Sequence, residues 1–202
     1  MSKLTKEQAY EFAAFLARQS GPGGRANLAE LRRAATDPEH DFRDLRILGP
    51  LLADDNRVFD AQRLTAGLFA LYAPRFWRPD STLNLPRFAP DVKRRSFGAS
   101  LRRLRDQLKA GQDSLDLRFA ALLDAPREDL TTPLRGLLQR LATAEPFIPV
   151  DFAALLQDLV FWDSDPLHGR SVRRAWARDY WQPAIAESEA TAEQPAADQP
   201  TV

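Results

Sequence analysis

The stretch VKRRSFGASLRRLRDQLK, residues 92–109, decides the fold class of this 202-residue chain. Its apolar residues recur at intervals of three and four positions, at Phe97, Leu101, Leu104 and Leu108. That spacing is the period of an α-helix with one face turned toward a core. The same stretch is rich in basic residues, although the whole chain balances 28 basic against 28 acidic residues. The pattern therefore predicts an amphipathic helix and raises the question of what its basic face contacts.

Helical periods recur on both sides of this stretch, and no segment shows the alternation typical of a β-strand. We therefore expect an all-α protein with a helix bundle in its C-terminal half. Thr5 and Gln8 have the spacing of a capping box, and Asp151 is expected to cap a later helix. The predicted helices cover about 5–19, 26–35, 41–53, 57–72, 97–108, 115–123, 132–141, 151–159 and 170–181.

Proline and charge divide the chain into four parts. Prolines at 74, 79, 86 and 90 predict a connector, because proline lacks a backbone donor and restricts the residue before it. The last segment has four carboxylates, no Lys or Arg and almost no large apolar residues, which is typical of disorder. We expect an N-terminal helical lobe (1–73), the connector (74–91), a C-terminal helical bundle (92–182) and an acidic disordered tail (183–202).

Composition argues against several classes of protein. The chain has no cysteine, which excludes disulfides and thiolate metal sites. No apolar run approaches the roughly 20 residues that span a bilayer, and the N-terminus lacks a signal-peptide core, so we expect a cytoplasmic protein without membrane contact. The two histidines, His40 and His168, have no ligand spacing, and no phosphate-binding glycine loop is present. We expect no enzyme activity, no cofactor and no metal site.

Three aspartates around Phe161 and Trp162 are the one alternative that would support catalysis. Asp158, Asp163 and Asp165 could hold Mg²⁺ for phosphoryl chemistry. Solvation at a helix end, or pairing with Arg170, Arg173 or Arg174, is a simpler explanation. An enzyme built on these carboxylates is therefore the least favoured function.

Arginine accounts for 24 of the 28 basic residues. Its planar fork matches pairs of phosphate oxygens and stacks on bases. A GC-rich coding sequence would also replace Lys with Arg, and composition alone does not separate the two explanations. Without the acidic tail the body carries 28 basic and 24 acidic residues, a net charge of +4.

The basic charge in the opening stretch has two interpretations. Arg102, Arg105 and Lys109 fall on one flank of the apolar stripe, which favours a polyanion-binding surface. The alternative is a solvated face on which Arg102 and Arg105 pair with Asp106. The scarcity of acidic residues within the run favours the first interpretation.

The start of the same helix is a possible anion site. Lys93, Arg94 and Arg95 precede the first turn, and Ser96 can cap it. Gly98 removes a side chain near the helix N-terminus, and a bare N-terminus beside arginines suits a phosphate.

Two arginines farther along lie at the edges of apolar stripes. Arg118 precedes Phe119, and Arg135 follows Leu134 on the next predicted helix. Long arginine stems can simply cover apolar surface, which is one explanation. On two antiparallel neighbouring helices, the same arginines would instead form one basic ridge. Among the aromatic residues, Trp162 and Trp176 are expected to pack in the core rather than to stack on bases. For Trp77 in the connector, both roles remain alternatives.

The residues that follow resemble a known family. RFAALLDAPREDLTTPLRGLLQRLATAEP (118–146), LLQDLVFWD (155–163) and VRRAWARDYW (172–181) are similar to CasB, the small subunit of the type I-E CRISPR Cascade effector complex. SFGASL (96–101) and LAELRRA (28–34) resemble further segments of that family. The matches keep their order over about residues 10–182, and the acidic tail lies outside them.

The resemblance implies an all-α, two-lobed and non-catalytic subunit for antiviral defense. Two copies would stack head to tail in the complex, beside the CasC backbone and the CasA large subunit. Their basic surface would hold crRNA and target DNA without reading sequence and so stabilise the R-loop. A body of charge +4 would bind free nucleic acid weakly and become effective only within the assembly.

Several basic residues match the family pattern position by position. Arg33, Arg118, Arg127 and Arg135 match bases of the family's motifs, and Arg57 matches through the looser context DNR. Gly136 departs from a second base that relatives often have after Leu-Arg. Together with the opening stretch, the predicted nucleic-acid-binding set is Arg32, Arg33, Arg57, Lys93, Arg94, Arg95, Arg102, Arg118, Arg127 and Arg135. The alternative function is a helical protein–protein interaction scaffold whose arginines pair with a partner and not with nucleic acid.

Overall fold

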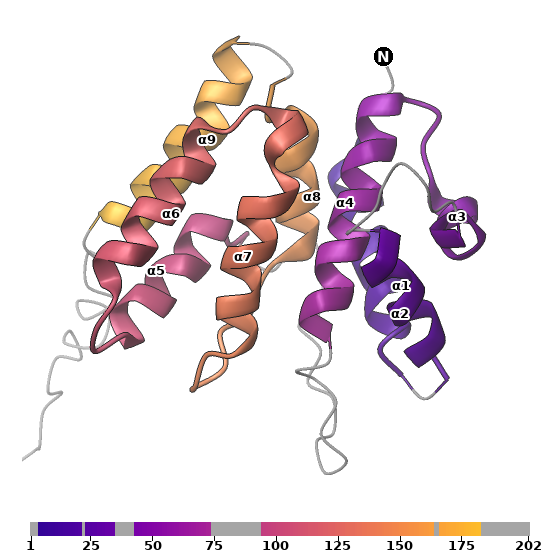
Figure 1. Cartoon of the computed structure of the whole chain (residues 1–202). Coiled ribbons are helices and arrows are strands. Elements are labelled where there is room, and N and C mark those ends of the chain that lie inside the picture. Colours follow the sequence, from indigo (N-terminus) through magenta and orange to yellow (C-terminus); the bar gives the residue numbers. More distant parts are fainter. Residues whose placement is uncertain (1–3, 22, 35–42, 74–93, 164–165, 183–202) are drawn as a thin grey trace, which may run out of the picture.

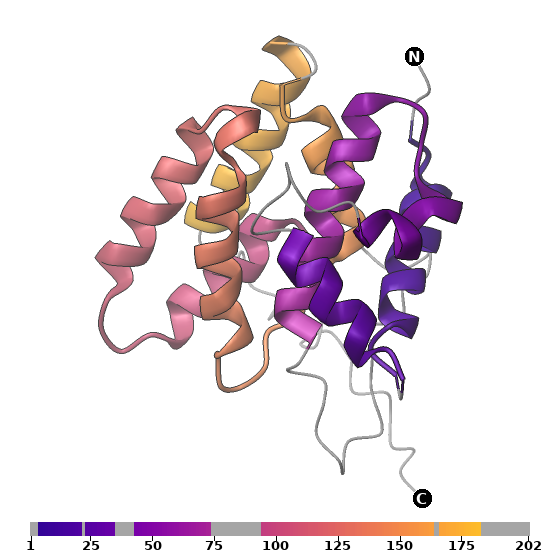
Figure 2. The ribbon, with the colours of Figure 1, turned by 45° about the vertical axis from the view of Figure 1, so that its right-hand side comes forward.

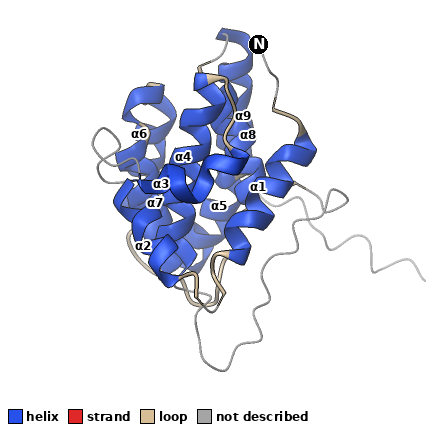
Figure 3. Cartoon of the chain, turned by 90° about the vertical axis from the view of Figure 1, so that its right-hand side faces the viewer, coloured by secondary structure: helices blue, strands red, loops and turns tan. Residues whose placement is uncertain are grey.

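The computed structural model describes residues 4–21, 23–34, 43–73, 94–163 and 166–182, with residue 34 and residues 166–170 described by their backbone alone. The predicted connector, the predicted tail and Lys93 lie outside these ranges. The described residues form nine α-helices and two short 3₁₀ helices, and none of them belongs to a β-strand (Figure 3). The prediction of an all-α protein is confirmed.

The helices follow one another along the chain as Figure 1 labels them. Before the connector they are α1 (Lys6–Arg18), α2 (Arg25–Ala34), α3 (Arg43–Leu48), η1 (Gly49–Leu51) and α4 (Asn56–Tyr72). After it they are α5 (Phe97–Gln107), α6 (Gln112–Asp124), η3 (Arg127–Asp129), α7 (Thr131–Ala142), α8 (Phe152–Phe161) and α9 (Pro166–Trp181).

Local signals in the sequence set most of these boundaries. The capping box is confirmed, because Thr5 Oγ1 accepts from the backbone N–H of Gln8 at 3.2 Å and the Thr5 N–H donates to Gln8 Oε1 at 2.9 Å. Asp151 caps α8 by accepting from the Ala154 N–H at 2.9 Å. The helix predicted over 41–53 is instead α3 followed by a 3₁₀ turn, because Pro50 cannot donate the hydrogen bond that would continue an α-helix.

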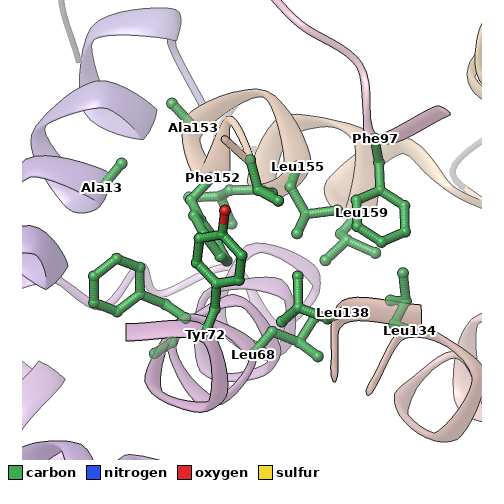
Figure 4. Packing of buried hydrophobic residues seen from close by; sticks show 14 of the residues in the cluster. Ala13, Leu68, Tyr72, Phe97, Leu134, Leu138, Phe152, Ala153, Leu155 and Leu159 are labelled. Carbon is green, nitrogen blue, oxygen red and sulfur yellow. The ribbon is translucent and has the colours of Figure 1, made fainter. Parts of the chain in front are cut away.

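α4 joins the two groups of helices. It packs against α2 on one side and against α7 and α8 on the other, and α1 also reaches α8. Figures 1 and 2 show α1–α3 on one side of α4 and the bundle α5–α9 on the other. The hydrophobic core is continuous across this junction, where Tyr72 of α4 lies 5.6 Å from Phe152 of α8, measured between ring centroids (Figure 4).

A close contact of two backbones holds α5 against α9. A Cβ atom added to Gly98 would lie 2.2 Å from the carbonyl oxygen of Trp176, so only glycine allows this approach. The indole of Trp176 packs on Phe97 at 5.2 Å and on Trp162 at 5.1 Å between ring centroids. Both tryptophans are fully buried, which confirms their predicted place in the core. We call the contact of Gly98 with Trp176 the α5–α9 seam.

Candidate nucleic-acid interface

Three arginines of the basic stretch 92–109 are paired with carboxylates of the fold. Arg94 forms an ion pair with Asp158, and Arg102 Nε lies 3.4 Å from Asp106 Oδ2. Arg105 donates from Nε and Nη2 to the two carboxylate oxygens of Asp116, at 2.8 and 3.1 Å. Pairing of Arg102 with Asp106 is confirmed, and pairing of Arg105 with Asp106 is wrong.

The partners of Arg94 and Arg105 lie on other helices. Asp158 is buried in α8, where it also accepts from Trp176 Nε1 at 2.7 Å. Burial raises the pKa of Asp158, and the neighbouring Arg94 guanidinium opposes that rise. On α6, the hydrogen bond from Arg105 lowers the pKa of Asp116, which also accepts from the Tyr180 hydroxyl at 2.6 Å. Much of the positive charge in residues 94–105 therefore stabilises the bundle.

The other aspartates of the possible catalytic cluster are also occupied by protein donors, as far as the structure describes them. Asp163 accepts from Arg173 Nη2 at 2.6 Å and from the backbone N–H of Arg127 at 2.7 Å. Its pairing with Arg173 confirms the simpler explanation of this carboxylate, while Asp165 lies outside the described residues. Within the described part of the chain, no three His, Asp or Glu side chains are grouped as metal ligands would be.

The start of α5 does not present a bare helix N-terminus. Ser96 caps it as predicted, accepting from the Ala99 N–H at 3.2 Å, and its hydroxyl donates to Asp179 Oδ2 at 2.6 Å. The backbone N–H of Arg95 donates to Asp151 Oδ2 at 3.3 Å. The interpretation of Gly98 as an opening for a phosphate is therefore wrong, because the chain's own carboxylates lie at this end and Gly98 faces α9.

The guanidinium group of Arg127 connects two parts of the fold by hydrogen bonds to backbone carbonyls. From the turn between α6 and α7, Nη1 donates to the carbonyl of Leu159 at 2.7 Å, and Nη2 donates to the carbonyl of Arg57 at 2.5 Å. Burial lowers the pKa of the Arg127 guanidinium. The side chain thus joins the start of α4 to the end of α8, and its contact with nucleic acid stays a prediction.

Replacing Arg127 with lysine should test the role of its side chain as a bridge between α4 and α8. Lysine keeps the charge, but its single ammonium cannot bridge two carbonyls as the planar fork does. We expect a loss of about 1–3 kcal/mol in the free energy of unfolding, the value of one or two hydrogen bonds to a charged donor. Urea denaturation followed by circular dichroism measures this. An unfolding curve equal to wild type would contradict the bridging role.

Arg118 on α6 and Arg135 on α7 differ from these paired residues. Arg118 is exposed and Arg135 is half-buried, and neither makes a hydrogen bond or ion pair to another described residue. Their two helices pack against each other. We call this pair the α6–α7 cations. No acceptor in the described part of the chain occupies their guanidinium donors.

Other basic residues of the predicted set lie on the N-terminal helices. Arg32 and Arg33 occupy the last turn of α2, where Arg32 has a buried Nε without a hydrogen-bond partner in the described structure. Arg57 is half-buried in the first turn of α4. The predicted set omits five basic residues that have no hydrogen bond or ion pair to described residues, namely Arg18, Arg103, Lys109, Arg140 and Arg174. The sequence already placed Lys109 on a basic flank of its stripe, and the position of Arg103 and Arg174 away from the apolar stripes of their helices was a signal that could have found them.

Whether a helix could span a membrane can be judged for the described residues. None of their helices combines the length and the apolar character that crossing a bilayer requires.

Comparison with known proteins finds a protein family that matches this chain. The family model described as CRISPR-associated protein Cse2 matches residues 27–181. A CRISPR-associated protein Cse2 of Thermus thermophilus is 38% identical over 92 residues. That alignment covers 46% of this chain and 50% of the relative, so it spans only half of the relative's length.

Solved structures extend the similarity to nearly the whole fold. The crystal structure of CasB from Thermus thermophilus superposes with a TM-score of 0.61 at 27% identity, covering 86% of this chain and 97% of that one. A chain of a CRISPR RNA-guided surveillance complex gives a TM-score of 0.60 at 24% identity, covering 85% and 92%. The second likeness shows a shared fold.

Proposed function

The chain belongs to the CRISPR-associated Cse2 family, and from this premise we propose that it is the non-catalytic small subunit of a type I-E Cascade complex. The observation that carries the proposal is the family match over residues 27–181, which includes most of the helices described above. A similarly folded chain from an RNA-guided surveillance complex supports an assembly of this kind.

Within that complex, we propose that the protein binds crRNA and target DNA through the α6–α7 cations and stabilises the R-loop. Unpaired guanidinium groups on two packed helices suit phosphates, and phosphate contacts carry no sequence information. R-loop formation exchanges duplexes of nearly equal stability, so a few backbone contacts can shift it. Base pairing with the guide RNA supplies the sequence specificity, so the protein needs to contact only the sugar–phosphate backbone of the nucleic acid.

The internal ion pairs of Arg94, Arg102 and Arg105 limit what the free subunit can do. With that charge already compensated, we expect weak binding of free nucleic acid and effective binding only when the assembly places the surface beside a strand. The proposed partners are CasC, CasA and a second copy of the chain, arranged head to tail.

Alanine at Arg118 or Arg135 should weaken binding of the assembled complex to target DNA by about 3- to 10-fold each, largely independent of sequence. Removing one phosphate contact should also reduce the slope of log K against log salt by about 0.7 on a single strand or 0.9 on a duplex. Titrating labelled target DNA at several salt concentrations measures both quantities. Arg33→Ala is expected to act in the same direction.

The matched control is Arg18→Ala on α1. Arg18 is also exposed, and it lies over the ring of Phe15, away from the α6–α7 cations. Its replacement should leave target binding unchanged. If all three test variants kept normal helicity and wild-type binding, those residues would not belong to the interface.

The assembly itself is tested by expressing the chain with its neighbouring genes and purifying it through a tag. Co-purification with several larger subunits and an RNA of uniform length supports the proposal. Recovery with one protein and no nucleic acid under gentle salt would favour the interaction scaffold.

A further inference from the structure

The outer face of α9 carries three side chains that the predicted set does not include. Arg174, Arg178 and Trp181 follow one another at intervals of four and three residues, so they lie on one face of the helix. The opposite face is buried in the bundle. Figure 1 shows α9 on the side of the molecule away from α1–α3. We call these three residues the α9 ridge.

Trp181 is an exposed aromatic ring that its neighbours hold in place. Its side of the helix leaves it 47% exposed, and only Leu117 and Phe147 are comparable among the large apolar residues described. Its ring lies 5.3 Å from that of Phe119 and 5.1 Å from that of Tyr180, the latter at an interplanar angle of 90°. An indole that is both supported and accessible provides a preformed surface on which another flat group can stack.

The basic members of the ridge keep donors available. Arg174 is exposed and makes no hydrogen bond or ion pair to a described residue. Its neighbour Arg173 is different, because it pairs with Asp163 at 2.6 Å and lies over the ring of Trp162 at 5.0 Å. Of these two adjacent arginines, Arg173 therefore stabilises the bundle and Arg174 faces solvent.

Arg178 lies between the other two members of the ridge. Its side chain is 60% exposed and contacts Asp179 through Nε alone, at 3.2 Å. Asp179 also accepts from the Ser96 hydroxyl, so that carboxylate is already shared. The two Nη groups of Arg178 are not used by this contact and remain open to an acceptor from outside.

We propose that the α9 ridge binds single-stranded nucleic acid, with a base stacked on Trp181 and phosphates bound by Arg174 and Arg178. This inference rests on the proposed function and adds a stacking site to it. The ridge extends about 10 Å along the helix axis, which is long enough to contact more than one nucleotide of a strand. A duplex hides its base faces within the stack, whereas a single strand can offer one to an exposed indole.

The test measures binding by the full-length chain at low ionic strength with two probes of equal length, an oligothymidylate and an abasic sugar–phosphate oligomer. Trp181→Ala should weaken binding of the oligothymidylate about tenfold, because stacking on one aromatic ring has that order of effect. Binding of the abasic probe should not change. Trp181→Phe should retain most of the affinity, and Arg174→Gln should weaken both probes about threefold.

Phe147→Ala is the matched control, since it removes an exposed aromatic ring from the segment between α7 and α8. Circular dichroism of each variant confirms that it folds. Equal oligothymidylate binding by Trp181→Ala and wild type, with weaker binding by Arg118→Ala, would overturn the ridge and leave the proposed function standing. Absence of binding to either probe by the wild-type chain, together with normal target binding by complexes carrying Trp181→Ala, would also overturn the ridge. If Trp181→Ala instead prevented incorporation into the complex while leaving oligothymidylate binding intact, the face would belong to a protein partner.

Discussion

Replacing Trp176 with alanine is expected to lower the free energy of unfolding by about 3–5 kcal/mol. The indole is fully buried between Phe97 of α5 and Trp162 at the end of α8. Its Nε1 also donates to the buried carboxylate of Asp158 at 2.7 Å. Alanine would leave a cavity and remove a donor from a carboxylate whose pKa burial already raises. Because small domains have a total stability of about 5–15 kcal/mol, urea denaturation should show a large shift in midpoint.

Trp176→Phe separates the two contributions. Phenylalanine keeps a ring in the cavity but cannot donate to Asp158, so the loss should fall to about 1–3 kcal/mol, including the cost of an unsatisfied acceptor. Phe147→Ala, at an exposed ring, gives the background for loss of an aromatic residue. Equal losses for Trp176→Ala and Trp176→Phe would mean that the hydrogen bond, and not the packing, dominates.

Gly98→Ala is expected to cost about 2–3 kcal/mol, although it adds only one methyl group; overpacking of this kind reaches the upper end of the usual range. That methyl would lie 2.2 Å from the backbone oxygen of Trp176, and a backbone cannot rotate away as a side chain can. The helices α5 and α9 would have to separate, which also loosens the packing of Phe97 on Trp176. Urea denaturation of the variant measures the loss.

Gly136→Ala on α7 is the matched comparison. A Cβ atom at Gly136 meets no atom within 4 Å, and the residue lies within a helix, where alanine is preferred to glycine. We expect this variant to be neutral or up to about 1 kcal/mol more stable than wild type. A loss at Gly136 equal to that at Gly98 would show that the seam has no special role.

Local patterns predicted the helices well, since each amphipathic stripe and cap acts within a few residues. The stripe from Phe97 to Leu104 is buried as expected, and Ser96 and Asp151 cap their helices. The role of Gly98 could not be predicted in the same way, because it depends on the backbone of Trp176, far along the chain. Absence of a side chain near a helix end fits an anion site and a close helix contact equally well.

The interface was harder to predict than the fold for a related reason. A run of arginines looks uncompensated when only its neighbours are considered, yet Arg94 pairs with Asp158 and Arg105 pairs with Asp116 across the bundle. Conversely, Trp181 is a large apolar residue that follows the buried Tyr180, which would suggest a place in the core. Its side chain lies at the end of α9 and is half-exposed. Charge and hydrophobicity in a sequence identify candidates, whereas availability depends on tertiary partners.

The α5–α9 seam also has a consequence for biosynthesis. Phe97 and Gly98 leave the ribosome well before Trp176, and at about 5–20 residues per second the delay is roughly 4–16 s. During this interval the nascent bundle has neither the indole that covers Phe97 nor the donor that binds Asp158. A chain whose translation stops before α9 would therefore display an apolar groove to chaperones and proteases. Of the helices that the structure describes, the last to be synthesised is the one that covers this groove in the finished protein.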